Sequence, residues 1–409
     1  MSTIGIIVFS IMRFSLMLFL AVFILSCSDE HNKLMTIDVA DSFENQMEVK
    51  LSEFVTGVTY IPLETIKESY ISDYPSIKVG DYIIVRNTGS DIPLLLFNKS
   101  DGKFIRTIGK VGRGPDEYNF PVKDYYNTGK NYVYTNGYKH NETKVFDLTG
   151  SFLYSFSRPE IAEPSVKGGK LSILFGTYLD DENYVSFIDN YTGAIKTKLV
   201  IFNKDSIRKI FPNYLKWGDK DLTKNRRPSF NTAFIRWNNN LYFKEIFNDT
   251  LFHVTTEELK PRLVFKMGKY GLSYEDQQKI SPSFGQISSE YFLITDIDEN
   301  SRFIFFCLSY YHNKRYIGFF DKKLKTTTIC RETPENNSAL IDDMNGFMPI
   351  IPLDFTQENE MISVLSPIEI LHWLENNHDK ANRLREEMQW LNDLTETSNP
   401  VIVIAKCKN

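Results

Sequence analysis

The chain has few cysteines, no histidine cluster and no motif of a known catalytic site. Its 409 residues include four cysteines and six histidines, with neither a C-x-x-C pair nor an H-E-x-x-H motif, so the sequence indicates no zinc site. No serine stands in a G-x-S-x-G nucleophile elbow. The formal net charge of −5 excludes a strongly basic surface for nucleic acid. These absences leave no catalytic class indicated, and we expect neither a metal nor another cofactor.

The longest apolar run lies at the N-terminus and is too short to cross a membrane. Residues 14–25 fall short of the ~20 apolar residues that a spanning helix needs, and they fit the apolar part of a cleaved signal instead. The run ends in Ile24-Leu25-Ser26-Cys27, which has the form of a bacterial lipobox. We therefore predict a lipoprotein signal peptide over residues 1–26 and lipid attachment at Cys27. An ordinary signal peptide with a chance cysteine is the alternative.

The residues around this signal predict its start and its destination. Met12 precedes Arg13, the one basic residue ahead of the apolar run, so translation begins at either Met1 or Met12. The acidic pair Asp29-Glu30 resembles the tract that directs lipoproteins of Bacteroidetes-type bacteria to the cell surface. We expect an outer-membrane protein held by lipid alone and exposed at the cell surface, with a periplasm-facing anchor as the alternative.

Composition favours a large all-β protein. Hydrophobic residues make up 42% of the chain and aromatic residues 14%, which excludes disorder and suits the half-buried surface of strands. Beyond Cys27 three cysteines remain, each in an apolar setting where cysteine behaves as a small buried hydrophobe. These residues are Cys307, Cys330 and Cys407. A disulfide between Cys307 and Cys330 stays open for an exported protein.

A hairpin pattern recurs along the chain. Each copy has an apolar strand, a turn and a second alternating strand, and the first three copies carry a glycine that supplies the positive φ of a tight turn. The copies span residues 94–109, 143–157, 184–202, 249–268 and 316–330. A further strand pair stands ahead of each hairpin, with examples at 76–87, 233–247 and 291–310. Four antiparallel strands per repeat are typical of propeller blades.

The two ends of the chain complete a sixth unit. Residues 346–353, 360–366 and 399–408 supply three strands, and residues 57–65 alternate like an outer strand that can dock beside the last one. Such pairing closes the ring and covers both edges.

A helical insertion over residues 367–395 interrupts this unit. Its start is predicted by Ser366 as the N-cap, Pro367 at the first helical position and Glu369 three residues after the cap, which is the spacing of a capping box. Its apolar stripe is expected to pack on the outside of the propeller, with a partner-binding helix as the alternative. The stripe consists of Ala381, Leu384, Met388 and Leu391.

The predicted fold is thus an all-β, six-bladed β-propeller closed by its N- and C-terminal strands. We assign residues 27–56 to an N-terminal tether and lead-in, and residues 57–409 to the propeller.

Five segments resemble a known family. They are IGKVGRGPDEY (108–118), GVTYIPLET (57–65), NDTLFHV (248–254), DDMNGFMPI (342–350) and NPVIVIAKCK (399–408). In combination they resemble the six-bladed β-propeller lipoproteins of gut Bacteroides and relatives. The resemblance implies a propeller of NHL-like or TolB-like appearance, exported and lipid-anchored, and it implies no established activity. Gly346-Phe347-Met348-Pro349 departs from the diglycine that the family more often shows there.

Candidate ligand-binding residues lie in connections from an outer strand to the next inner strand, which open on one face of a propeller. Gly109, Gly112 and Gly114 are interpreted as turn residues, because Pro115 and strand pattern follow where a phosphate-binding loop would need a helix. An arginine in this loop can bind an anion or tie neighbouring loops together. Long loops on a rigid scaffold favour further candidates. The full set is Arg113, Asp116, Glu117, Tyr118, Trp217, Arg226, Arg227, Tyr270, Asp342, Asp343 and Asn345.

The sequence favours binding over catalysis. The leading hypothesis is a monomeric, lipid-anchored propeller that binds a glycan, peptide or partner protein on its loop-rich face, in the setting of nutrient uptake. The alternative is a metal-dependent hydrolase or lyase with carboxylates at the propeller axis. Acidic pairs such as Asp180-Asp181 could bind calcium, although adjacent acids more often serve as turn residues. A third hypothesis is a scaffold for a protein complex.

Overall fold

The computed structural model describes residues 34–72, 75–87, 92–118, 121–137, 141–173, 176–217, 233–275, 290–310, 314–333 and 336–408. The predicted signal peptide and Cys27 lie outside these residues. Among the helices described, none is long and apolar enough to cross a bilayer.

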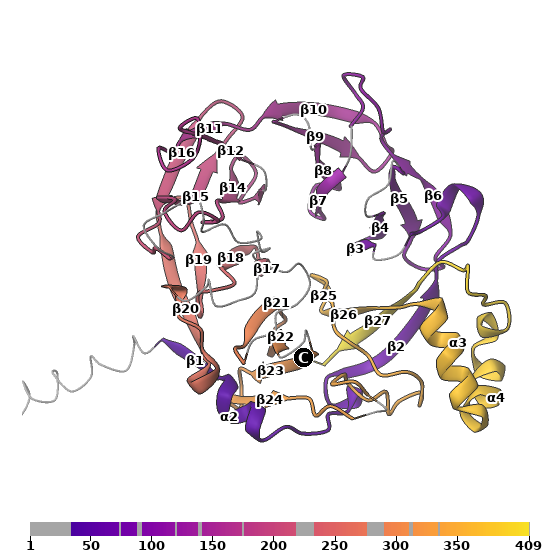
Figure 1. Cartoon of the computed structure of the whole chain (residues 1–409). Coiled ribbons are helices and arrows are strands. Elements are labelled where there is room, and N and C mark those ends of the chain that lie inside the picture. Colours follow the sequence, from indigo (N-terminus) through magenta and orange to yellow (C-terminus); the bar gives the residue numbers. More distant parts are fainter. Residues whose placement is uncertain are drawn as a thin grey trace, which may run out of the picture.

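Six four-stranded antiparallel units stand around a central axis, as predicted (Figure 1). We number these blades along the chain and give their strands from the axis outward. Blade 1 contains β3 (Ser76–Val79), β4 (Tyr82–Arg86), β5 (Leu94–Asn98) and β6 (Phe104–Ile108). Blade 2 contains β7 (Pro121–Asn127), β8 (Tyr132–Gly137), β9 (Glu142–Asp147) and β10 (Phe152–Ser157). Blade 3 contains β13 (Thr177–Tyr178), β14 (Tyr184–Phe187), β15 (Thr197–Phe202) and β16 (Ile207–Pro212).

The second half of the ring follows the same order. Blade 4 contains β17 (Ala233–Trp237), β18 (Asn240–Lys244), β19 (Thr250–Val254) and β20 (Leu259–Lys266). Blade 5 contains β21 (Leu293–Glu299), β22 (Phe303–Tyr310), β23 (Lys314–Asp321) and β24 (Thr326–Ile329). Blade 6 contains β25 (Asp354–Phe355), β26 (Glu360–Leu365), β27 (Val401–Cys407) and β2 (Val55–Pro62).

Strands from the two ends of the chain close the ring. β2 pairs antiparallel with β27, and Val58 lies opposite Ala405 in this register. This pairing confirms the predicted closure, with β2 beginning two residues earlier than expected at Val55. The blade 1 hairpin fits tightly against the closing strand. A Cβ added at Gly102, whose φ is +71°, would lie 2.2 Å from the Pro62 carbonyl oxygen, so both the turn and the close approach require glycine there.

The N-terminal segment is part of the propeller over its described residues. β1 (Met35–Asp38) pairs parallel with β20 and gives blade 4 a fifth, outermost strand. α2 (Val39–Glu44) and the 3-10 turn η1 (Leu51–Glu53) then lead to β2. Val39 and Leu51 are fully buried. The lead-in assigned to residues 27–56 therefore contributes to the core, because these apolar side chains have blades 4 to 6 to pack against.

Two predicted strand assignments were wrong. Residues 184–202 form the second and third strands of blade 3, whereas its outer hairpin runs from β15 to β16. Gly193 therefore lies in the connection between β14 and β15 and not in the turn of the outer hairpin. Residues 346–353 form no strand, and the short β25 provides the inner strand of blade 6.

The helical insertion packs outside the ring beside β2, as Figure 1 shows. It comprises α3 (Pro367–Asn376), α4 (His378–Glu387) and the 3-10 turn η5 (Gln389–Asn392). Three stripe residues are buried and Met388 packs against the same core cluster. The expected outward packing is therefore present. The buried residues are Ala381, Leu384 and Leu391.

The remaining elements are short. β11 (Glu160–Ala162) and β12 (Lys170–Ser172) form a separate hairpin between blades 2 and 3. Two more 3-10 turns occur at η2 (Lys67–Ser69) and η3 (Gly268–Tyr270). Cys307, Cys330 and Cys407 are buried and form no disulfide, which resolves the question that the sequence left open.

Candidate functional site

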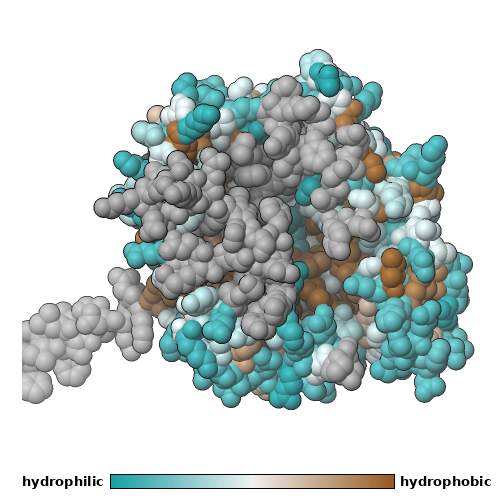
Figure 2. All heavy atoms as spheres, viewed as in Figure 1, coloured by the Kyte–Doolittle hydropathy of each residue, from teal (hydrophilic) through white to brown (hydrophobic). Residues whose placement is uncertain are grey.

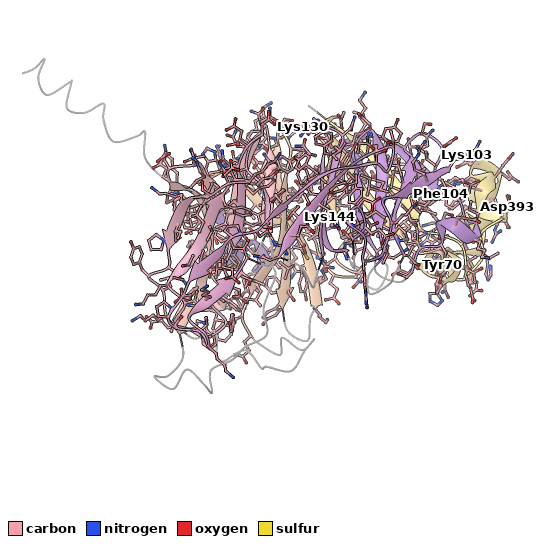
Figure 3. The ribbon with its side chains drawn as sticks, turned by 90° about the horizontal axis from the view of Figure 1, so that it is seen from above. Tyr70, Lys103, Phe104, Lys130, Lys144 and Asp393 are labelled. Carbon is pink, nitrogen blue, oxygen red and sulfur yellow. The ribbon has the colours of Figure 1, made fainter. Side chains whose placement is uncertain are left out.

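The two faces of the propeller are built by different connections. Links from an outer strand to the next inner strand all open on one face, which we call the loop-rich face, and the turns inside each outer or inner hairpin lie on the other. In the edge-on view of Figure 3, Tyr70 from the β2–β3 link lies toward one face, and Lys103 and Lys130 from hairpin turns lie toward the other. Figure 2 views the ring as Figure 1 does and shows hydrophilic residues along much of its outer rim.

The link between blades 1 and 2 is a fixed loop. The Tyr118 hydroxyl donates to the Ile108 carbonyl oxygen at 2.7 Å and accepts from the Leu94 amide at 2.9 Å. The Glu117 carboxylate accepts from the Gly114 amide at 2.8 Å. A Cβ at Gly112 would lie 2.0 Å from the same carboxylate. Tyr118, only 2% exposed, therefore braces the blades, and Glu117 shapes the loop.

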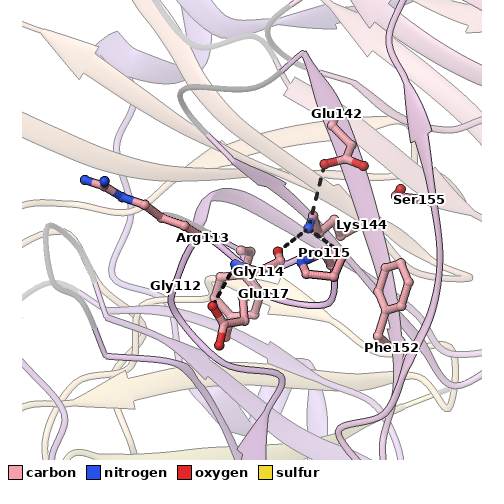
Figure 4. Close-up of a pocket in the computed structure, with 10 residues that line it drawn as sticks. Gly112, Arg113, Gly114, Pro115, Glu117, Glu142, Lys144, Phe152 and Ser155 are labelled. Atoms are coloured by element: carbon pink, nitrogen blue, oxygen red, sulfur yellow. Dashed lines mark hydrogen bonds and ion pairs between the residues drawn. The ribbon is translucent and has the colours of Figure 1, made fainter.

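A cavity of about 390 Å³ lies between this loop and the outer strands of blade 2 (Figure 4). Lys144 on β9 holds the loop in place, because its Nζ donates to the carbonyl oxygens of Pro115 at 2.7 Å and Gly114 at 3.3 Å. The Glu142 carboxylate lies 3.8 Å from the same ammonium. Phe152 and Ser155 on β10 complete the wall. The Lys144 ammonium is thus bound by groups of the protein itself.

Arg113 stands at the edge of this cavity. Its side chain extends away from the Lys144 ammonium in Figure 4 and is exposed. Within the described part of the chain, no ion pair is formed by Arg113 or by the exposed Asp116. The loop therefore presents one guanidinium to solvent beside the cavity.

The other candidates do not join this cavity. Trp217 is 4% exposed, and its Nε1 donates to the Asn190 carbonyl oxygen, so its ring is a core element. Tyr270 stacks on Phe292 with ring centroids 4.2 Å apart and donates to Glu44 of α2, which fixes the N-terminal segment. Arg226 and Arg227 lie outside the described residues.

The acidic candidates form hydrogen bonds with residues just before and within β2, the outer strand of blade 6. The Asp342 carboxylate accepts from the Tyr60 hydroxyl at 2.7 Å and from the amide of Asn345 at 3.0 Å. Asp343 accepts from the Ser52 hydroxyl at 2.6 Å. Hydrogen bonds from Ser52 hold the pKa of Asp343 below its ordinary value despite the opposing cost of desolvation. The Asn345 carbonyl accepts from Arg383 of α4. All three residues therefore have structural partners.

Two carboxyl groups meet on inner strands, where the enzymatic alternative would place its site. Asp298 on β21 accepts from the Phe355 amide at 2.8 Å, and Asp354 on β25 forms an ion pair with Lys78 on β3 at 2.8 Å. Removal from water and the neighbouring Asp354 raise the pKa of Asp298 well above its ordinary value. Across the described residues, no three His, Cys, Asp or Glu side chains gather as metal ligands. Lys78 therefore neutralises Asp354, and the raised pKa of Asp298 favours its uncharged form.

Sequence reasoning missed the residues contributed by blade 2. Lys144 and Glu142 lie on a strand that reads as an ordinary hairpin copy, and they are about thirty residues from the loop they contact. The alternation of β9 places both side chains on one face. No signal in the sequence indicates that the loop folds over that face.

The fold and the site define a six-bladed β-propeller with a ligand-sized cavity under one inter-blade loop. The family model described as "Domain of unknown function (DUF4934)" matches residues 34–406. The chain therefore belongs to the DUF4934 family. Curated proteins give no match.

Two solved structures from Bacteroides share this fold. A "putative exported protein" of Bacteroides fragilis aligns with a TM-score of 0.63 at 18% identity, covering 92% of this chain and 100% of that one. A member of the DUF4221 family from Bacteroides vulgatus aligns with a TM-score of 0.52 at 9% identity, covering 89% of this chain and 99% of that one. At these sequence identities, the similarity establishes a shared fold alone.

Proposed function

We propose that this protein is a non-enzymatic binding propeller that takes an anionic glycan, peptide or partner protein on its loop-rich face. The observation that carries the proposal is the cavity beside Arg113, since pockets of ~300–1,000 Å³ are typical of ligand sites and this one measures about 390 Å³. The description of a structural neighbour as a putative exported protein supports placing this function at the cell envelope. Nutrient uptake is the setting that we propose for it.

We infer the charge of the ligand from the basic side chains at the cavity that have no partner charge within the described protein. Lys144 is committed to two carbonyl oxygens and lies close to Glu142. Arg113 is exposed and carries a planar guanidinium that suits carboxylate or phosphate bidentately. A ligand with one acidic group can therefore pair with Arg113 while its body enters the cavity against Phe152.

Replacing Arg113 with alanine is expected to weaken binding of an acidic ligand about 10-fold, which corresponds to ~1.4 kcal/mol. The reason is loss of a charge-assisted contact without loss of a core side chain. Screening of the purified protein on arrays of acidic and neutral glycans and peptides would identify the ligand, and calorimetric titration would measure its affinity.

The matched control is Arg208→Ala, because Arg208 is an exposed arginine on the outer strand of blade 3. We expect it to leave the affinity unchanged. Equal affinities of Arg113→Ala and the unmodified protein would contradict the proposal, as would an array response limited to uncharged ligands.

The proposal includes a lipid anchor on Cys27. In a bacterial host that processes lipoproteins, we expect the protein in the membrane fraction carrying incorporated palmitate, since acyl chains attach a protein without a spanning helix. Cys27→Ser is expected to move it to the soluble fraction. Cys407→Ser serves as the control, because that thiol is buried in the last strand. Unlabelled protein, or identical fractionation of Cys27→Ser, would rule out the anchor.

A further inference from the structure

A second cavity, of about 460 Å³, lies at the opposite mouth of the ring. Its walls come from the β17–β18, β21–β22 and β25–β26 turns, which end the inner strands of three consecutive blades. An inner strand enters from the loop-rich face and therefore ends at the other one. The cavity thus lies near the axis, away from Arg113 and on the face of the hairpin turns.

The charged groups in this cavity are satisfied within the protein. Glu299 has a side chain 1% exposed and receives two hydrogen bonds from Arg262, at 2.5 and 2.6 Å, and one from Lys322 at 2.8 Å. Arg236 donates to the carbonyl oxygens of Tyr178 and Leu179 and lies over the Tyr178 ring. A ligand therefore meets little unbalanced charge here.

Two aromatic rings in the wall are fixed by neighbouring side chains. Lys322 lies 4.1 Å from the Trp237 ring centroid and Arg262 lies 5.5 Å from it. Phe355 stacks on Phe305 with centroids 4.7 Å apart and planes 25° apart. Both rings line the cavity and remain partly exposed. They are rigid apolar surfaces available to a ligand at low entropic cost.

The other lining groups are amides and hydroxyls. Asn238 and Asn239 occupy the β17–β18 turn with φ of +49° and +61°, where glycine would cost the backbone least. Both are exposed, as are Ser301 and Gln357 on the facing turns. Amide and hydroxyl groups can donate and accept hydrogen bonds without carrying charge.

We propose that this mouth is a second binding site, for a neutral oligosaccharide. Pyranose rings have an apolar C–H face that suits Trp237 and Phe355, and a rim of hydroxyls that suits the surrounding amides. Peptides that bind by strand addition need an exposed sheet edge, and those that bind as helices need a long groove, whereas this cavity is walled by three turns. The ligand class therefore differs from the anionic one assigned to the loop-rich face.

The test is calorimetric titration of the purified full-length protein with neutral tetrasaccharides of glucose, mannose, galactose and xylose. We expect at least one to bind with a Kd below about 1 mM. Asn239→Gly and Gln357→Ala are each expected to raise that Kd several-fold, and about 10-fold when combined. Asn239→Gly also relieves a positive φ, which offsets the greater freedom of glycine in the unfolded chain, so we expect little change in stability.

Two controls separate this site from the rest of the molecule. Asn131→Gly makes the same exchange at a positive-φ asparagine, with φ of +53°, in the β7–β8 turn outside the cavity. Arg113→Ala alters the loop-rich face. Both should leave the Kd for the tetrasaccharide unchanged.

Three results would each overturn the inference. One is no binding of any tetrasaccharide at 10 mM. Another is binding that survives the combined Asn239→Gly and Gln357→Ala variant. The third is binding lost equally in Arg113→Ala, which would place the sugar on the loop-rich face and leave the function proposed there intact.

Discussion

Replacing Asn399 with alanine is expected to lower the free energy of unfolding by about 3 kcal/mol, because it would remove the side-chain partner of two buried backbone groups, the Ser69 carbonyl and the Ile71 amide. Asn399 is 1% exposed. Its Nδ2 donates to the carbonyl oxygens of Glu64 at 2.7 Å and Ser69 at 2.8 Å, and its Oδ1 accepts from the Ile71 amide at 2.9 Å. One side chain thus ties the residues before the last strand, β27, to the segment that follows β2.

Denaturant unfolding of purified protein measures this effect. Asn392→Ala provides the control, since that asparagine is exposed in the same part of the chain and bonds to Arg385 within the helical insertion. We expect it to change stability by less than ~0.5 kcal/mol. A loss below ~1 kcal/mol in Asn399→Ala would show that Asn399 does not secure the closure of the ring.

Replacing Glu299 with alanine is expected to cost about 3–5 kcal/mol, because two cations would stay buried without their shared anion. The side chains of Arg262 and Lys322 are 18% and 15% exposed, so neither reaches water freely. Burial already lowers the pKa of Lys322, and Glu299 opposes that shift. Lys322 should therefore lose its proton more readily in the variant.

Unfolding at neutral pH and at pH 9 would test the second effect. Deprotonation of Lys322 relieves part of the unpaired charge, so we expect the deficit of Glu299→Ala to shrink as the pH rises. Glu387→Ala removes an exposed ion pair, with Arg383 at 3.8 Å, and should cost less than ~0.5 kcal/mol. Similar losses in the two variants would contradict the buried-network interpretation.

The candidate site was predictable only within one stretch of the chain. Arg113, Asp116, Glu117 and Tyr118 lie together because they belong to one loop. Trp217 was selected as an aromatic in a long link, yet its side chain fills a core cluster. The sequence shows that an aromatic is present, whereas its exposure depends on which neighbouring loops cover it.

Alternating apolar residues, turn glycines and a matching strand at each end of the chain determined the class of fold. These signals are local, since a strand period or a positive φ is set by neighbouring residues. They could not assign each hairpin to its place in a blade, and Gly193 was therefore placed in the wrong connection.

The tertiary structure alone decided where the two cavities lie. The cavity beside Arg113 needs Lys144 from another strand, and the opposite mouth needs turns near residues 238, 300 and 357. Residues so far apart become neighbours only when the ring closes through β2 and β27. Sequence patterns encode which face of a strand is buried, but the distance between blades is fixed by how six blades pack around one axis.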